Sequence, residues 1–311
     1  MKTHLPPHSS GCRPCQSRLR QLVAVTGLSG LAILSPVSAS VLPPEGLVAN
    51  KTYSEWLAAS WKWALETPWD GHHPLQDNTG ADALRNQSGP VWFLGAGPSS
   101  SPTAKRRIVI PDSQMLYVAI GDVESSTLED CPFCGSNEAE LRASVEQFHL
   151  QELACMIDGS PVTNLEAFQV TSPMYSFTLP AQNILGIPGG GSGQSVAAGI
   201  GVIVEPFTPG LHTIYLHSTY AEDPAHSLSQ MTYEITVVAR PTLSIRALPG
   251  TNQLEISWPD TQGFSLEQAD DCRPSAVWVP AEVDSSSLDN GIRLATVTLE
   301  SDQRYFRLHF N

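Results

Sequence analysis

The sequence has little positive charge. Its 311 residues hold 17 Lys and Arg against 31 Asp and Glu, which gives a formal net charge of −14. Proteins that bind nucleic acid or anionic membrane surfaces attract those partners through Lys and Arg. The acidic balance therefore argues against both classes of partner. It is compatible with cation binding, although its commoner consequence is solubility.

Long apolar runs are also lacking. The longest, residues 22–37, is too short to span a bilayer comfortably. It follows a stretch with four basic residues and no acidic one, and it ends in the small residues of positions 37–39, as secretory signal peptides do. We expect residues 1–39 to be a signal peptide that is removed before Ser40. The mature chain would then carry a charge of −18, lack a transmembrane segment and be secreted, either extracellular or periplasmic.

Four cysteines follow the predicted cleavage site: Cys131, Cys134, Cys155 and Cys272. An exported chain can form disulfides. A second C-x-x-C or H-x-H pair, which a zinc site of the ribbon type needs, is missing. The βαβ setting of a redox C-x-x-C is missing as well. The pattern favours a structural disulfide between Cys131 and Cys134.

Several catalytic motifs are absent. The sequence has no G-x-S-x-G elbow and no glycine-rich dinucleotide fingerprint. Residues 186–195 are rich in glycine but lack the G-K-[ST] ending of a phosphate cradle, so we expect a flexible loop there. No cofactor is expected. Paired carboxylates for glycoside hydrolysis need only be close in space, so that alternative stays open. His212 follows a Pro-Gly turn, and we expect it to secure that turn.

The hydrophobic pattern predicts a mainly β protein. Residues 52–68 form the clearest helix, with a capping box from Thr52 and Glu55, and a second helix is expected at 138–148. The other elements are short strands, which predict an antiparallel β-sandwich with one or two helices over residues 40–240. Six short alternating runs then predict a small fibronectin/immunoglobulin-like β-sandwich as an accessory module at 241–311.

The first predicted helix carries three tryptophans. Its continuous apolar face favours anchoring against a sheet. The alternative is a sugar-stacking platform, with Trp56 and Trp63 as ligand-binding residues. Beyond the 70–88 segment, we expect Trp92 to be buried against Trp56 or Trp61.

Residues 71–97 place two adjacent histidines in front of two aspartates. His72, His73, Asp77 and Asp82 are the candidate ligands for a divalent metal, but no H-x-H or H-E-x-x-H pattern supports them. The aspartates are equally suited to satisfy their own backbone in turns. We therefore expect a mainly structural segment in which both histidines are exposed.

Several motifs resemble a family of uncharacterised exported bacterial proteins. These proteins share a W-x-W-A helix, a D-x-T-G turn, a Q-x-G-P-V-W-F-L strand, a D-G-x-P-V turn and a P-G-x-H-T-I strand, and the likeness covers most of residues 50–240. Residues 242–311 resemble the C-terminal modules of large exported bacterial proteins. The resemblance implies the architecture and export, and it implies no chemistry.

Two functions remain. The first is an exported non-catalytic protein for surface association, adhesion or glycan binding, with a polysaccharide or a cell-surface component as partner. The second is an extracellular hydrolase or lyase that acts on a polysaccharide, with or without a metal, near the 70–87 loop. Clustered acids or histidines in a cleft would favour the enzyme, and a flat aromatic strip would favour glycan binding.

Overall fold

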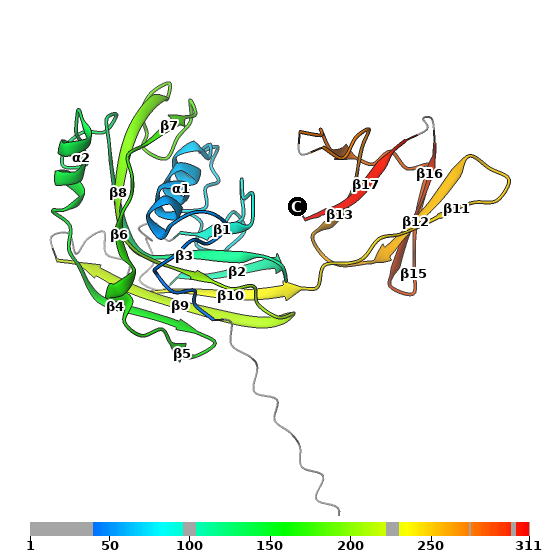
Figure 1. Cartoon of the computed structure of the whole chain (residues 1–311), viewed down its shortest axis with the longest axis horizontal. Helices are drawn as coiled ribbons and strands as arrows, with labels where there is room; N and C mark the ends of the chain where they lie inside the picture. Colours follow the sequence, from blue (N-terminus) through cyan, green and yellow to red (C-terminus); the bar gives the residue numbers. More distant parts are fainter. Residues whose placement is uncertain (1–39, 96–103, 222–229, 274, 300–302, 311) are drawn as a thin grey trace, which may run out of the picture. The chain divides into compact units, whose positions relative to one another are not determined.

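The computed structural model of the chain describes residues 40–95, 104–221, 230–273, 275–299 and 303–310 (Figure 1). These residues are mainly β and contain two α-helices, as the sequence predicts. The expected signal peptide at 1–39 lies outside the described residues. Neither helix in these ranges is long and apolar enough to cross a bilayer.

The first sheet of residues 40–240 has β8 at its centre. Its strands are β1 (Val91–Leu94), β3 (Met115–Ser126), β8 (Gly191–Val204), β6 (Gln169–Thr171) and β7 (Tyr175–Leu179). They pair in the order β1-β3-β8-β6, and β7 pairs with a different part of β8. A short 3₁₀ turn, Leu165–Phe168, precedes β6.

The second sheet has the order β2-β10-β9-β4-β5. Its strands are β2 (Ala104–Pro111), β10 (Met231–Val238), β9 (Gly210–Tyr220), β4 (Leu150–Ile157) and β5 (Ser160–Pro161). Fully buried residues of both sheets, among them Val118, Val202 and Ile214, belong to one hydrophobic cluster. The core of this β-sandwich is therefore shared by both sheets.

Helix α1 (Tyr53–Glu66) packs on the first sheet, with contacts to β7, β8 and β3 (Figure 1). Its start confirms the predicted capping box, because Thr52 and Glu55 exchange side-chain to backbone hydrogen bonds. Helix α2 (Glu138–Val145) begins after Asn137, whose side chain accepts from the N–H of Glu140. Local polar signals set both helix starts.

The pairing of two strands departs from the antiparallel expectation. Strand β1 pairs parallel with β3, and β2 pairs parallel with β10. Parallel pairing needs a long crossover connection rather than a tight hairpin. The chain between β1 and β3, which includes β2, provides the crossover for the first pair. Turn signals that separate short strands do not reveal such long-range pairing.

The glycine-rich segment is partly a strand rather than a loop. Strand β8 already begins at Gly191, so the expectation of a flexible loop over 186–195 is wrong for its second half. A Cβ at Gly193 would lie 2.8 Å from Leu128 and 3.0 Å from Phe177. Glycine is needed there because these side chains pack against the strand.

Residues 241–310 form two further sheets with their own hydrophobic cluster. The four-stranded sheet contains β11 (Ser244–Ala247), β12 (Gln253–Pro259), β16 (Ile292–Thr298) and β15 (Ser285–Asp289), in that order. The three-stranded sheet contains β14 (Val279–Pro280), β13 (Phe264–Ala269) and β17 (Tyr305–Phe310). Trp258 and Ile256 are buried at the centre of the cluster. That residues 241–311 are an independent domain stays a prediction.

Candidate functional site

The segment between α1 and β1 is held by its own polar contacts. Arg85 forms two hydrogen bonds to the carboxylate of Asp70, of 2.7 and 2.9 Å. The Asp77 carboxylate accepts from the backbone N–H of Thr79 at 2.7 Å and from that of Asp82 at 2.9 Å. Aspartates that satisfy nearby backbone groups are typical of turns. These contacts form an ordered connection.

The two adjacent histidines have different surroundings. His72 is exposed, and its Nδ1 lies 3.2 Å from a carboxylate oxygen of Asp82. His73 is buried, with Nε2 3.0 Å from the carbonyl oxygen of Ala64 and Nδ1 accepting from the N–H of Leu75 at 3.2 Å. Burial lowers the pKa of His73, which favours the neutral ring. The expectation that both histidines are exposed is wrong for His73, because its ring links α1 to the loop.

His72, His73, Asp77 and Asp82 do not converge on one point. Both ring nitrogens of His73 are engaged, and the Asp77 carboxylate holds backbone N–H groups. Within the described ranges, no three His, Cys, Asp or Glu side chains are grouped as metal ligands would be. The contacts of these four residues are those of a folded loop.

The two tryptophans considered as ligand-binding residues also have different environments. Trp56 is 5% exposed in the core, and its indole donates to the carbonyl of Val48 at 2.9 Å. Trp63 is half-buried and lines a cavity together with Trp61. The Trp63 indole donates to the carbonyl of Arg85 at 2.8 Å. The structure therefore brings Trp63 and Trp61 together at one cavity and leaves Trp56 in the core.

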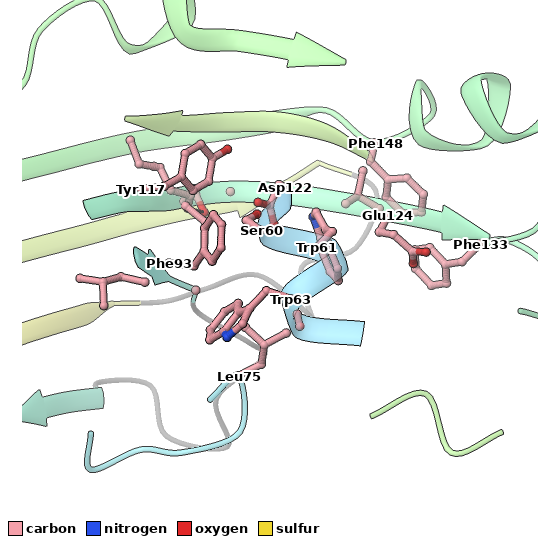
Figure 2. Close-up of a pocket in the computed structure, with 18 of the residues that line it drawn as sticks. Ser60, Trp61, Trp63, Leu75, Phe93, Tyr117, Asp122, Glu124, Phe133 and Phe148 are labelled. Atoms are coloured by element: carbon pink, nitrogen blue, oxygen red, sulfur yellow. Dashed lines mark hydrogen bonds between the residues drawn. The ribbon is translucent and has the colours of Figure 1, made fainter. Parts of the chain in front are cut away.

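This cavity has a volume of about 260 Å³ and is lined by residues of α1, β1, β3 and β9 (Figure 2). We call it the α1–β3 cavity. Phe93 joins Tyr117 and Trp63 in one aromatic wall, with ring centroids 6.2 and 5.5 Å from its own. A second wall contains Phe133 and Phe148, which stack with centroids 5.1 Å apart. Aromatic faces thus cover much of the lining.

Asp122 contributes a carboxyl group to the α1–β3 cavity. Figure 2 shows it between the wall of Phe93 and Tyr117 and the wall of Phe133 and Phe148. Burial raises the pKa of Asp122 to about 7, because an apolar environment disfavours the charged form. Its side chain is half-buried and lines the cavity, so solvent or a ligand in the cavity can reach it. Asp122 therefore titrates near neutral pH.

Glu124 and Glu129 form a second acidic feature of the same lining. Glu124 is 4% exposed and accepts a hydrogen bond of 2.7 Å from Ser195. Glu129 accepts one of 2.7 Å from Ser126. Burial raises the pKa of both groups, and the neighbouring Glu129 raises that of Glu124 further. Both carboxyls are engaged inside the protein, which leaves Asp122 as the acid free to meet a ligand.

Two polar groups of the lining have no hydrogen-bond partner among the described residues. They are the hydroxyl of Tyr117, whose residue is 1% exposed, and the indole N–H of Trp61. The Trp61 N–H is near enough to Asp122 to lower the pKa of that carboxyl, although its geometry falls short of a hydrogen bond. Buried polar groups are rarely left unpaired. A molecule that enters the cavity could supply the hydrogen bonds that these two groups do not form within the protein.

A β-bulge places Asp122 in the cavity. Strand β3 shifts register against β8 between Ala119 and Gly121. Side chains alternate along a strand, and one extra residue reverses the alternation beyond it. Tyr117 before the bulge and Asp122 after it therefore face α1 together. The bulge was not visible in the sequence, which shows only an apolar run followed by Gly-Asp.

Two glycines of β8 make room for these side chains. A Cβ at Gly201 would lie 2.4 Å from the hydroxyl of Tyr117. One at Gly199 would lie 2.4 Å from the Cβ of Asp122, which is its register partner. The glycine-containing run A-A-G-I-G-V in the sequence was the available signal, but its meaning depends on the pairing with β3.

The predicted disulfide supports the second aromatic wall. Cys131 and Cys134 are joined, and Phe133 lies between them in the chain. The backbone N–H of Ser126 donates to the carbonyl of Phe133 at 3.1 Å, which ties this loop to the end of β3. The disulfide loop thus positions a side chain that lines the cavity.

A second, shallower groove contains Trp69. Gln76, Gln182 and Asn183 also line it. The Asn183 side chain is engaged by the backbone of its own loop, including a 2.8 Å hydrogen bond to Ile187. A half-buried ring beside amide groups resembles a shallow sugar subsite, but none of the described residues that line this groove has a buried polar side-chain atom without a partner. Trp69 is therefore the natural control for ligand binding at Trp61.

The Pro-Gly turn before β9 shows the structural role expected of His212. Its Nδ1 lies 2.8 Å from the carboxylate of Asp158, and its Nε2 lies 2.8 Å from the carbonyl oxygen of Thr208. The Asp158 carboxylate also accepts from the N–H of Thr213. These contacts secure the turn. His212 is not among the residues that line the α1–β3 cavity.

No protein-family model and no curated protein matches the chain. Two solved structures show a weak likeness. One is the structure of PbICP-C in complex with falcipain-2, which is 14% identical to this chain. The match covers 49% of this chain and 100% of the other chain, with a TM-score of 0.18. Another is bovine butyrophilin, which is 9% identical to this chain. The match covers 66% of this chain and 93% of the other chain, also with a TM-score of 0.18. Likeness at this level carries no argument, so membership of a family stays a prediction.

Proposed function

We propose that the protein is an exported, non-catalytic binding protein that takes a small ring-shaped ligand into the α1–β3 cavity. A sugar ring of a polysaccharide or of a cell-surface component belongs to this class. The signal-peptide pattern at 1–39 and the Cys131–Cys134 disulfide support export, because disulfides persist in oxidising compartments.

The unpartnered Tyr117 hydroxyl carries this proposal. Leaving a buried donor or acceptor unsatisfied costs about 1–3 kcal/mol. The cavity adds a second unpartnered donor at Trp61 and an accessible acid at Asp122. Pockets with apolar walls and a few convergent polar groups are the usual form of small-molecule sites. A ligand that met these groups would satisfy them while its ring packed on the aromatic walls.

Ligand-induced thermal shifts test this proposal. Purified mature protein is screened against monosaccharides and other small cyclic compounds. We expect a compound that raises the melting temperature of the wild type and of Trp69→Ala but not that of Trp61→Ala. The Trp69→Ala variant is the matched control because it removes an indole from the shallow groove, and Trp69 is not part of the cavity lining.

A shift that survives Trp61→Ala and is lost in Trp69→Ala would move the site to the shallow groove and overturn the cavity proposal. The absence of any shift across the screen would count against ligand binding and leave surface association through the protein exterior as the better account.

Acid–base catalysis by a hydrolase or lyase is the second candidate. Asp122 titrates near neutral pH, and buried carboxyls with raised pKa values serve as general acids in glycosidases. Glycoside hydrolysis usually needs two carboxyls that reach the substrate. Here Glu124 is engaged with Ser195, which favours binding over this chemistry.

Incubation of the protein with polysaccharides separates the two candidates. Release of reducing ends or unsaturated products by the wild type, lost in Asp122→Asn and kept in Asp130→Asn, would replace the binding proposal by the enzyme. We expect no product from any of the three proteins.

A further inference from the structure

We propose that the ligand of the α1–β3 cavity is an organic ammonium ion, held by the Asp122 carboxylate and by the faces of the surrounding aromatic rings. This inference rests on the proposed function and adds the charge of the ligand.

The ionisable side chains of the lining favour a cation over an anion. The lining holds three carboxyl groups, those of Asp122, Glu124 and Glu129, and none of the described lining residues is Lys, Arg or His. Arg106 on β2 donates to the carbonyl of the lining residue Gly95, but it is not among the groups that shift the pKa of Asp122. A positive ligand would therefore meet no side-chain cation among the described lining residues.

The aromatic walls of the cavity also favour a cation. A cation over the face of Trp, Tyr or Phe is attracted by the negative face of the ring, by about 2 kcal/mol or more when desolvated. Trp61 and Trp63 approach from α1, and Phe133 and Phe148 approach from the opposite wall. An acid between aromatic walls can hold an ammonium group more tightly than a neutral group of the same shape.

Tyr117 is 99% buried and belongs to the same lining, and its hydroxyl has no hydrogen-bond partner among the described residues. Tyr117 lies on the strand that carries Asp122, and the two groups interact electrostatically. Its oxygen can accept a hydrogen bond from an ammonium N–H. The Tyr117 oxygen forms no hydrogen bond with the described residues of the protein, so it is an acceptor that the ligand can use.

The proposal fixes the sign of the pH dependence. Three tyrosines interact electrostatically with Asp122: Tyr117 on its own strand, Tyr175 on β7 and Tyr220 on β9. The Glu124–Glu129 pair lines the same cavity, and Trp61 of α1 adds an uncharged donor. Ionised Asp122 binds the cation, so binding releases its proton. Affinity should rise about tenfold per pH unit up to about pH 7 and then level off. A neutral ligand that accepts a hydrogen bond from protonated Asp122 would show the opposite trend.

Cyclohexylammonium and cyclohexanol are the test pair, because they share a ring and differ in charge. Titrations by calorimetry and by tryptophan fluorescence are run from pH 5 to pH 8. We expect cyclohexylammonium to bind the wild type at least about tenfold more tightly than cyclohexanol at pH 8, with affinity rising between pH 5 and pH 7. Asp122→Asn should lose both the preference and the pH dependence.

Asp130→Asn is the matched control. It makes the same change in net charge at a neighbouring exposed residue outside the lining, so it should keep both properties. Thermal melts of both variants check that they are folded.

Equal, pH-independent binding of both compounds would overturn the ammonium proposal and leave the cavity as a binding site for neutral rings. A preference retained in Asp122→Asn would also overturn it. If neither compound binds the folded wild type, the ammonium proposal fails, while the wider screen with other compounds decides the proposed function separately.

Discussion

At the scale of single residues, the carboxyl group of Asp122 affects both the stability of the fold and the proposed binding of a ligand. Burial among aromatic rings raises its pKa to about 7, so a proton is held up to neutral pH. An aspartate in the unfolded chain loses its proton near pH 4. Ionisable groups whose pKa is strongly shifted are common at functional sites, so this shift marks Asp122 as a candidate functional residue.

Asp122→Asn should therefore stabilise the protein at high pH. Between about pH 4 and 7 the folded state binds more protons than the unfolded state, so the free energy of unfolding falls as pH rises. Asparagine has no proton to lose, and the variant should exceed the wild type by about 2–4 kcal/mol at pH 8 while matching it near pH 4. Urea unfolding at several pH values measures this difference. A constant difference across this range would show that Asp122 titrates normally.

His73→Ala should be the costly substitution of the histidine pair. His73 is 2% exposed and links the carbonyl of Ala64 to the N–H of Leu75, so its loss removes two hydrogen bonds and a buried ring between α1 and the loop. We expect a destabilisation of about 1–3 kcal/mol. His72→Ala, the exposed control, should stay within about 0.5 kcal/mol. Similar effects of the two substitutions in thermal melts would contradict the structural role given to His73.

At the scale of elements, the sequence predicts features that depend on neighbouring residues, but it does not predict which strands pair. The caps at Thr52 and Asn137 and the disulfide of C-P-F-C depend on neighbouring residues, and the sequence predicts them. The parallel pairing of β1 with β3 and the bulge near Gly121 depend on distant partners. The acids of the cavity were missed for this reason, because only the bulge places Asp122 beside Tyr117. The sequence did contain Trp63, but without the fold nothing separated it from Trp56.

Strand β1 gives a direct test of this reasoning. The sequence predicted that Trp92 packs against the helix tryptophans, but Phe93 does so, with its centroid 6.1 Å from Trp56 and 5.5 Å from Trp63. Phe93 is the register partner of Tyr117, and the alternation of side chains turns Trp92 to the other face. Phe93→Ala should cost about 3–5 kcal/mol. Trp92→Ala should cost less, because Trp92 is only half-buried; chemical denaturation that ranks them the other way would contradict this register.

At the scale of the whole molecule, the candidate chemistry belongs to residues 40–240, and residues 241–311 supply a separate cluster of buried side chains. The complete strand pattern of residues 241–311, with Arg240-Pro241 as the boundary before it, predicts that this second part folds alone. The corresponding fragment should show one cooperative thermal transition with modest stability, because small domains bury a lower fraction of their surface. A fragment that melts without cooperativity would show that the boundary at Arg240-Pro241 is wrong.

The carboxyl resonance of Asp122, followed by carbon NMR as a function of pH, tests the cavity most directly. We expect a midpoint near pH 7 in the free protein, because burial disfavours the charged form. Saturation with cyclohexylammonium should move this midpoint down, because the cation stabilises the carboxylate. A midpoint near pH 4 that does not respond to the cation would contradict both the buried acid and its role in binding.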